Sequence, residues 1–380
     1  MKKLKDFCKN AALVLFTVVL LLSFIEMATR WIYTRKMINA KDFRKSRPKP
    51  YAESEYFSEK FVDEAYLEPG KWINPKGTRI ILPDNFAGEY FNVENNLRRT
   101  TDVPQKFSRH IYLFGGSTIY CAEVPDKYTV ASYLQRKLNT IFPDEFRVVN
   151  CGVTSINTGQ QLDKLKDITL NENDIVCFYG GVNDALLFLT GRINGWIVGE
   201  NDRELISKNL NAIQRFRFSV YQNLHMRSRF VEIFLNPFSY QVPAPLRDSS
   251  SIKKMQSALL ISYNKSITSA DSICRSKKGY FFNFLQPHIL TRGNNTPYEK
   301  ELMKNTFINP TPWLVALKYS YPVLIEANRE LSKLGVHSTD LTAMFNNTQN
   351  DYYLDFCHVT EKANEQIAAE ILKVINEPKK

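Results

Sequence analysis

The chain has few of the residues that build metal sites and disulfide frameworks. Its 380 residues include only five histidines and six cysteines. No Cys-x-x-Cys pair and no histidine–cysteine cluster is present, so the spacing patterns of zinc sites are absent and we expect no metal or cofactor. Cys151 and Cys177 lie in apolar runs typical of reduced core residues. For Cys121 and Cys357 the sequence leaves open whether the two thiols approach one another or pair.

A net positive charge over the body of the chain is also missing. The formal net charge is +11, but residues 1–50 hold twelve lysines and arginines against three acidic residues. That segment therefore carries +9 and the rest of the chain only +2. Since nucleic-acid binding needs a basic patch on the folded domain, this distribution argues against a nucleic-acid partner.

The same N-terminal segment contains an apolar run, residues 11–25. These fifteen uncharged residues are short of the ~20 that a membrane-spanning helix needs, and they also fit the core of a signal peptide. No small-x-small cleavage site follows, and helical continuation through Trp31 and Tyr33 would supply the missing length and interfacial aromatic residues. We therefore predict an uncleaved signal anchor over residues 1–35, in preference to a cleaved signal peptide.

The stretch with chemical meaning is Ile111-Tyr-Leu-Phe-Gly-Gly-Ser-Thr118. Four apolar residues lead directly into two glycines, which predicts a buried strand that ends in a tight turn. Open α/β sheets bind ligands at the carboxyl ends of their strands, so Ser117 would be exposed there as a nucleophile. An ordinary turn in which Ser117 caps the next helix fits the same pattern.

Three later segments favour the nucleophile. Residues 148–153 and 174–184 are two further apolar strands, and the second ends in Gly-Val-Asn183-Asp. Near the C-terminus, Asp355-Phe-Cys-His358 precedes a helical run. A serine hydroxyl is a weak nucleophile until a base accepts its proton, and an aspartate three residues before a histidine can hold the imidazole in one tautomer.

Donors for the oxyanion of a tetrahedral intermediate are also at strand ends. The backbone N–H groups of Ser117 and Gly152 and the side-chain amide of Asn183 would be brought together by a parallel sheet. His288 follows an apolar strand, and it either lines the mouth of the pocket or is a structural histidine. No histidine other than His358 follows an acidic residue at such short spacing. Further candidates for the pocket are Gly116 and Asp184.

In this order, the four blocks resemble the SGNH hydrolases, the GDSL-like esterase superfamily. The resemblance covers roughly residues 108–375. It puts the family's four named residues on Ser117, Gly152, Asn183 and His358, with Asp355 as the partner of the histidine. The usual aspartate before the serine is Gly116 here, a form that many membrane-linked members share. The resemblance implies a serine esterase that removes an acyl group, typically acetyl, from a carbohydrate or glycolipid through an acyl-enzyme.

Two other functions stay open at this point. A transferase that moves acetyl groups onto a surface polysaccharide would use the same serine site, with a sugar hydroxyl in place of water. A non-enzymatic glycan-binding protein with a relic site is the third interpretation. Because the resemblance is to esterases of surface glycans and lipids, we expect an extracytoplasmic catalytic domain. The more numerous cations after the apolar run favour the opposite orientation.

Strands that alternate with helical segments predict a parallel sheet with right-handed crossovers. With the resemblance, this gives a flavodoxin-like α/β/α sandwich of three layers, with Ser117 at the topological switch point. We place that domain at 108–380, after a juxtamembrane linker at 36–50 and a small β-rich extension at 51–107. Residues 190–250 and 288–322 are predicted insertions, and the second is predicted to be a long loop that acts as a lid.

Overall fold

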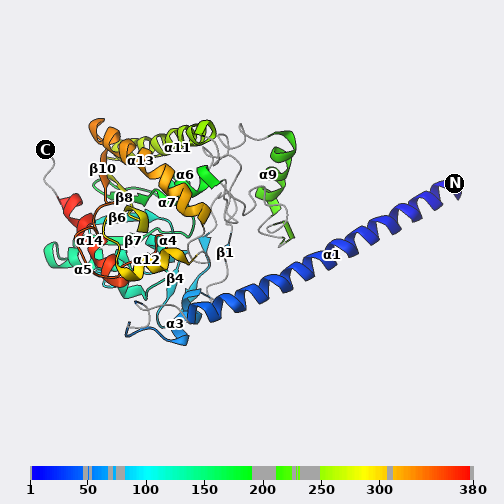
Figure 1. Ribbon diagram of the computed structural model, residues 1–380, viewed down its shortest axis with the longest axis horizontal. Coiled ribbons are helices and arrows are strands. Elements are labelled where there is room, and N and C mark those ends of the chain that lie inside the picture. Colours follow the sequence, from blue (N-terminus) through cyan, green and yellow to red (C-terminus); the bar gives the residue numbers. More distant parts are fainter. Residues whose placement is uncertain are drawn as a thin grey trace. The chain divides into compact units, whose positions relative to one another are not determined.

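The computed structural model divides into two compact units (Figure 1). One contains residues 1–46 and 210–239, and the other contains residues 47–209 and 240–380. The structure describes residues 2–45, 50, 54–66, 72–73, 82–190, 211–224, 228, 230–231, 249–305 and 311–376. The predicted insertion at 190–250 therefore lies mostly outside the described residues.

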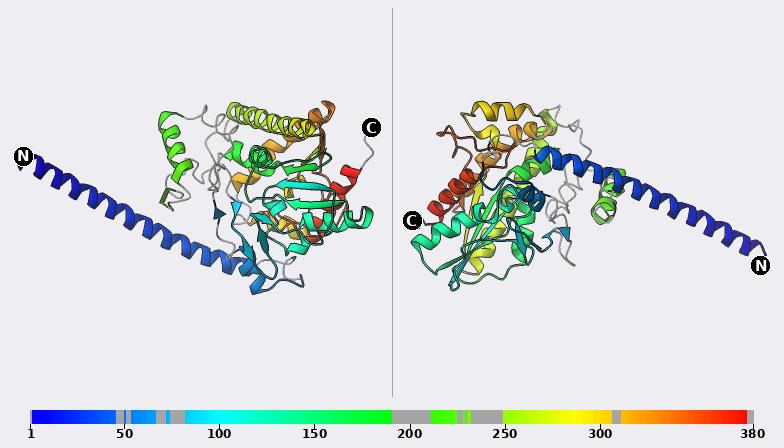
Figure 2. Two further views of the ribbon diagram at one scale, coloured as in Figure 1. Left: turned by 180° about the vertical axis from the view of Figure 1, so that it is seen from behind. Right: turned by 90° about the horizontal axis from the view of Figure 1, so that it is seen from below.

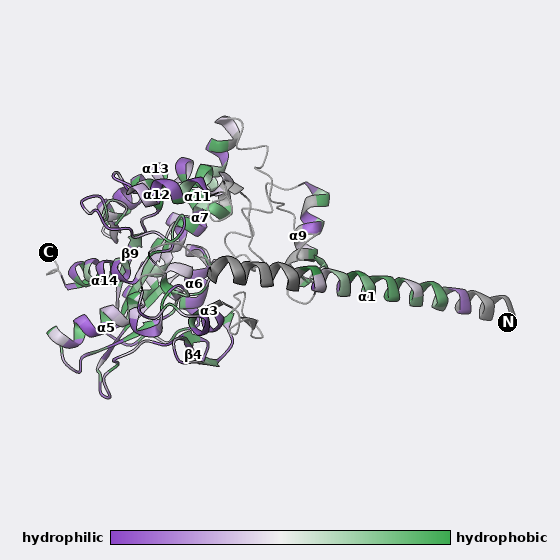
Figure 3. Cartoon of the chain, turned by 60° about the horizontal axis from the view of Figure 1, so that its bottom comes forward, coloured by the Kyte–Doolittle hydropathy of each residue, from purple (hydrophilic) through white to green (hydrophobic). Residues whose placement is uncertain are grey.

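The first unit is built on helix α1, Lys2–Lys45. The helix continues well past residue 25, as predicted, and its segment Lys9–Ile32 has 24 residues and contains an 18-residue stretch with a mean hydropathy of 2.4. Figure 3 shows hydrophobic residues along this part of α1. The segment is long and apolar enough to cross a membrane. Signal sequences meet the same criterion, so the uncleaved anchor stays a prediction.

Glu26 is an acidic residue inside this apolar segment, and the structure pairs it. Its Oε1 lies 2.8 Å from Nε of Arg30, and its Oε2 accepts hydrogen bonds from Oγ of Ser228 at 2.8 Å and from N–H of Phe230 at 3.2 Å. Helix α9, Ala212–Leu224, belongs to the same unit. A charge within a membrane segment is costly unless it is paired, and these contacts provide partners on both carboxylate oxygens.

The second unit contains an eight-stranded sheet of order β10-β9-β8-β6-β7-β5-β4-β3. The five strands from β10 to β7 are parallel, and β5, β4 and β3 continue the sheet antiparallel beyond β7. If the five parallel strands are numbered by their order in the chain, their order across the sheet is 2-1-3-4-5. This confirms the flavodoxin-like prediction. The parallel strands are β6 (Arg109–Gly115), β7 (Phe146–Asn150), β8 (Ile175–Gly180), β9 (Tyr280–Leu285) and β10 (His337–Asp340).

Helices cover both faces of this sheet, which completes the three layers (Figures 1 and 2). All six residues of β8 are buried, as expected for a central strand covered on both sides. One helical layer contains α5 (Val130–Ile141) and α14 (Glu361–Asn376), which pack on each other. The other contains α6 (Thr158–Lys166), α7 (Val182–Thr190), α11 (Ser249–Ser276) and α13 (Thr311–Lys333).

The segment before the first parallel strand contains short strands. The pair β1 (Trp72–Ile73) and β2 (Leu82–Pro83) stands apart, whereas β3 (Phe86–Ala87), β4 (Asn92–Glu94) and β5 (Leu97–Arg98) lengthen the main sheet. Helix α3, Glu59–Tyr66, is fastened to the β3–β4 turn by one carboxylate. The buried Glu64 accepts the backbone N–H groups of Glu89, Tyr90 and Phe91 at 3.0, 2.7 and 3.3 Å.

The prediction of a long loop at 288–322 is wrong for the residues that the structure describes in this range. The 3-10 helix η3 (Ile289–Thr291), helix α12 (Pro297–Lys304) and the first half of α13 occupy it. Thr296 and Glu299 form a capping box around a proline at the first helical turn. This start signal lies within an Asn-, Pro- and Thr-rich stretch, whose composition alone is typical of a loop.

Arg292 and Glu299 form an ion pair whose side chains are both 0% exposed. Arg292 also donates to the carbonyl oxygens of Thr348 and Asn350 at 2.7 and 2.9 Å, and Glu299 accepts the N–H of Tyr352 at 3.1 Å. The pair therefore holds the loop that leads into Asp355 and His358.

We expect Glu299→Ala to lower the free energy of unfolding by about 3–5 kcal/mol, because it leaves the Arg292 charge buried without its partner. Urea unfolding of the purified protein measures this. The matched control is Glu301→Ala on the same helix, which breaks an exposed pair with Lys304 and should change stability by less than about 0.5 kcal/mol. Equal stabilities of the two variants would contradict the assigned role.

Candidate active site

Ser117 lies where β6 ends and the short helix α4, Ser117–Tyr120, begins. The next two strands in sequence, β7 and β8, flank β6 on opposite sides. Ligands of open α/β sheets bind at this switch point, outside the carboxyl ends of the strands. Gly116 is the N-cap of α4 and no side chain caps it, so the interpretation of Ser117 as a helix cap does not hold.

A chain of hydrogen bonds connects Ser117 to His358 and Asp355. His358 Nε2 lies 2.8 Å from Ser117 Oγ, although the residues are 241 positions apart, and His358 Nδ1 lies 2.6 Å from Asp355 Oδ2. The other carboxylate oxygen, Oδ1, accepts the backbone N–H groups of Cys357 and His358 at 2.9 and 2.7 Å. One carboxylate therefore shapes the loop and orients the ring, in the geometry of a Ser-His-Asp triad.

The surroundings of His358 favour its protonated form. Burial of the ring, whose side chain is 16% exposed, lowers its pKa. Asp355, Cys357 and Glu123 outweigh this, and the pKa stands well above the usual 6.5. Burial raises the pKa of the Cys357 thiol to about 11, so this group is neutral near pH 7. The two carboxylates are therefore the groups that stabilise the imidazolium.

Asn183 is in the first turn of α7 and lies against Gly116, the residue before the serine. Its Nδ2 donates to the carbonyl oxygen of Ile156 at 2.9 Å, and an amide nitrogen carries two hydrogens. A Cβ built on Gly116 would lie 2.4 Å from this nitrogen. The glycine before Ser117 thus makes room for the amide that the sequence assigns to the oxyanion.

Gly152 follows β7 and also makes room for a close approach, since a Cβ there would lie 2.4 Å from the backbone nitrogen of Tyr120. Its own N–H donates to Asn150 Oδ1 at 2.9 Å, and Asn150 Nδ2 donates to the carbonyl oxygen of Ile119 at 2.8 Å. The donor that we assign to the oxyanion is thus engaged in this structure, and its role stays a prediction. Sequence reasoning missed Asn150, which joins β7 to α4.

Asp184 and His288 are each 1% exposed and make structural contacts. Asp184 accepts the N–H and the hydroxyl of Thr158 at 3.1 and 2.9 Å, at the start of α6. His288 Nδ1 accepts the N–H of Leu290 at 3.2 Å, and burial lowers the pKa of His288 to about 3, so the ring is neutral. This burial leaves neither side chain accessible to a substrate in this structure.

Two cysteines and one glutamate complete the surroundings of His358. Cys121 and Cys357 are buried free thiols, so they do not pair. Glu123 Oε1 lies 3.8 Å from His358 Nε2, and its side chain is 10% exposed. Sequence reasoning missed Glu123, because a single acidic residue six positions after the serine matches no spacing pattern.

Asp355, Cys357 and His358 carry donor atoms within 4.8 Å of one another, close enough to share a metal ion. As ligands they fit poorly. The imidazole Nδ1 and the Asp355 carboxylate are already bonded to each other at 2.6 Å, and the other carboxylate oxygen accepts two backbone N–H groups. The group is better described as two members of the triad with a neutral neighbour.

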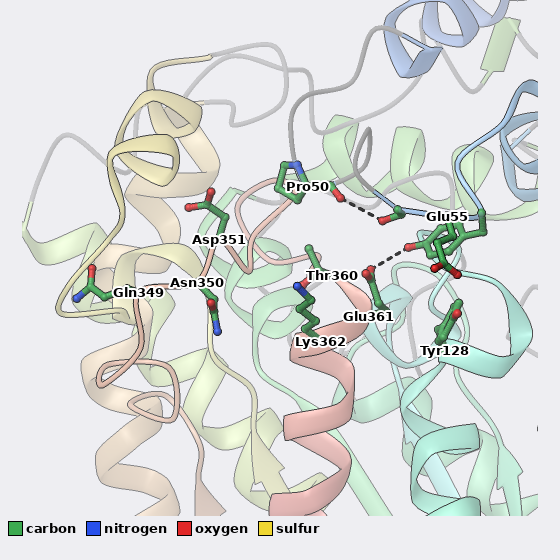
Figure 4. A pocket seen from close by; sticks show the side chains of 11 residues that line it. Pro50, Glu55, Tyr128, Gln349, Asn350, Asp351, Thr360, Glu361 and Lys362 are labelled. Carbon is green, nitrogen blue, oxygen red and sulfur yellow. Dashed lines mark hydrogen bonds between the residues drawn. The ribbon is translucent and has the colours of Figure 1, made fainter.

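A polar cavity of about 540 Å³ lies at the start of α14, which begins three residues after His358 (Figure 4). Thr360, Glu361 and Lys362 line one part of it, and Tyr128 lines another. The hydroxyl of Tyr56 donates to Glu361 Oε2 at 3.0 Å across its edge. The remaining lining residues are Pro50, Ser54, Glu55, Gln349, Asn350 and Asp351.

No protein-family model and no curated protein matches this chain. Among solved structures, a catalytic mutant of Axe2, an acetylxylan esterase from Geobacillus stearothermophilus, is similar with 12% identity and a TM-score of 0.40, covering 71% of this chain and 95% of that one. A putative lipolytic protein of the G-D-S-L family from Desulfitobacterium hafniense shares 8% identity over 70% of this chain and 99% of its own, with a TM-score of 0.36. At these scores neither similarity carries an argument about activity.

The pH dependence of Ser117 reactivity tests the His358 assignment. The rate of labelling by a fluorophosphonate should rise as the imidazole loses its proton, with a midpoint above pH 6.5 because its pKa is raised. Asp355→Asn removes a carboxylate that raises this pKa, so the midpoint should move to lower pH. The maximum rate should fall by up to about 10⁴, since the tautomer is lost.

Ser117→Ala, the control, should remain unlabelled at every pH. A midpoint that is the same with and without the Asp355 carboxylate would show that another group acts as the base.

Proposed function

We propose that the chain is a serine ester hydrolase that transfers an acyl group to Ser117 and then to water. The observation that carries this proposal is the hydrogen-bond chain from Asp355 through His358 to Ser117. When its imidazole has lost the extra proton, a histidine bonded to a serine hydroxyl activates the serine for attack on a carbonyl carbon. Its position at the switch point of the sheet supports the same function.

In the first half of the reaction, Ser117 Oγ bonds to the ester carbon while its proton passes to His358 Nε2. Asp355 stabilises the imidazolium that forms, through the 2.6 Å contact with Nδ1. The tetrahedral intermediate then expels the alcohol, which takes the proton from Nε2. In the second half, water attacks the acyl carbon and its proton passes to Nε2, and that proton moves to Ser117 Oγ as the bond from the acyl carbon to Oγ breaks.

The negative oxygen of each tetrahedral intermediate needs donors fixed in advance. We assign this to the N–H of Ser117 and the side-chain amide of Asn183, with Gly152 as the third predicted donor. The fit of the Asn183 amide against Gly116 supports this assignment, because it holds the amide next to the nucleophile. Engaging Gly152 requires its N–H to leave Asn150.

For the substrate, we propose an O-acyl ester, typically O-acetyl, on a carbohydrate or glycolipid. The resemblance of the four sequence blocks supports this class. The cavity at the start of α14 supports it as well, because carboxylates, amides and tyrosine hydroxyls are groups that bind sugar hydroxyls.

The test is acetate release from an acetylated oligosaccharide by the full-length protein in detergent. We expect turnover by the wild type and none by Ser117→Ala, because only the hydroxyl can carry the acyl group. A parallel reaction adds an unacetylated oligosaccharide as acceptor. If the acceptor becomes acetylated and no free acetate is released, the same serine catalyses the transferase reaction instead. The wild type could instead fail to react with a fluorophosphonate and also fail to release or transfer acetate. In that case the site is not a working esterase, and the glycan-binding alternative is favoured.

We further propose that α1 anchors the protein with its catalytic unit on the extracytoplasmic side. The predicted retention of the apolar segment and the proposed class of substrate support this orientation, whereas the cations after the apolar segment count against it. A pair of reporters fused after residue 380, one active only outside the cytoplasm and one only inside, decides the orientation. Activity of the cytoplasmic reporter alone would reverse it and require an intracellular substrate.

A further inference from the structure

Glu123 places a second carboxylate beside the catalytic imidazole, on the side opposite Asp355. Asp355 contacts Nδ1, whereas Glu123 Oε1 lies 3.8 Å from Nε2, the nitrogen that also contacts Ser117 Oγ at 2.8 Å. The side chain is 10% exposed, so this carboxylate lies in the wall of the site rather than on an open surface.

The loop that carries Glu123 is held at both ends. Cys121 adopts the left-handed region with φ of 53°, and its thiol donates to the carbonyl oxygen of Thr118 at 3.0 Å. After Glu123, the carbonyl oxygen of Val124 accepts a hydrogen bond from Arg98 at 2.9 Å. Arg98 is itself buried in an ion pair with Asp126 at 2.8 Å. The carboxylate is thus presented by rigid backbone.

The second half of the reaction brings a hydroxyl to the same nitrogen. Once Ser117 Oγ is acylated, Nε2 must accept the proton of the incoming nucleophile. His358 Nε2 and Glu123 Oε1 are 3.8 Å apart. If a water oxygen lies about 2.8 Å from each of them, the angle at the water between the two atoms is roughly a right angle. That angle is near the spread of its two hydrogens, so one hydrogen can point at His358 and the other at Glu123.

We propose that Glu123 binds the nucleophile of the deacylation step and holds it against Nε2 of His358. The proposal rests on the proposed function and adds a residue to its second half. The nucleophile's oxygen bonds to the acyl carbon, its proton passes to Nε2, and that proton moves to Ser117 Oγ as the acyl–Oγ bond breaks. Glu123 exchanges no proton. A sugar hydroxyl has a single hydrogen for Nε2, so in a transferase Glu123 would bind a neighbouring hydroxyl of the same sugar.

This placement has an electrostatic consequence that can be measured separately. The titratable groups that face His358 are Asp355 and Cys357 from its own loop and Cys121 and Glu123 from the loop after α4. Burial lowers the pKa of His358, and Asp355, Cys357 and Glu123 raise it. Replacing Glu123 by glutamine therefore moves the acid limb of kcat/KM to lower pH.

The experiment follows p-nitrophenyl acetate turnover by the full-length protein in detergent, with rapid mixing. At high pH, Glu123→Gln should change the initial burst of p-nitrophenol and the fluorophosphonate labelling rate much less than it changes steady-state turnover. In acylation the Glu123 charge only adds to the stabilisation of the imidazolium by Asp355, which keeps its contact with Nδ1. Steady-state turnover should fall by about 10- to 100-fold, the scale for a misplaced reactant. Slower deacylation makes the acyl-enzyme accumulate, so kcat and KM should fall by the same factor. The ratio kcat/KM, which reports acylation, should stay nearly unchanged at high pH.

Two further variants separate positioning from charge and from folding. Glu123→Asp keeps the charge but draws the oxygen back by one methylene, so deacylation should slow while the acid limb stays near wild type. Glu94→Gln, an exposed glutamate of the same unit, should match wild type in every measurement.

A Glu123→Gln variant whose labelling and turnover fall equally, or whose turnover is unchanged, would overturn the role in deacylation. A wild-type protein with neither labelling nor burst would instead overturn the esterase proposal itself.

Discussion

The geometry of the site depends on one carboxylate, that of Asp355. Its Oδ1 closes the turn by accepting two backbone N–H groups, and its Oδ2 holds the imidazole of His358. Without that turn, the ring has no fixed direction toward Ser117 across the sheet. The ion pair of Arg292 and Glu299 fixes the segment that leads into the same loop. Charge buried for structural reasons thus sets the position of the reacting groups.

The sequence predicted the parts of this site that follow strand ends. Apolar runs that stop at glycines located Ser117 and Asn183, and the three-residue spacing located Asp355 beside His358. The sequence did not predict Asn150 and Glu123, because their roles depend on which loops meet in space rather than on local spacing. The prediction of a loop before α13 was wrong for a related reason. It was based on the composition of the segment, whereas the reciprocal hydrogen bonds of Thr296 and Glu299 start a helix there.

Gly116 shows how the absence of a side chain shapes this site. The amide of Asn183 occupies the space that any side chain at position 116 would fill, so an aspartate there would displace it. The glycine therefore suits a site in which the amide packs directly against the turn before Ser117. Glu123 lies beside His358, on a loop held by Arg98.

The nucleophile and its base belong to distant parts of the chain, and α14, which follows the base, packs on α5, which follows the nucleophile. Contacts of such sequence separation form late, since the loop between them must close first. During synthesis, a chain extended to residue 350 holds Ser117, Asn183 and most of the parallel sheet, yet it has no base. Ser117 therefore has no imidazole partner until α14, the helix that follows His358, has formed and packed on α5.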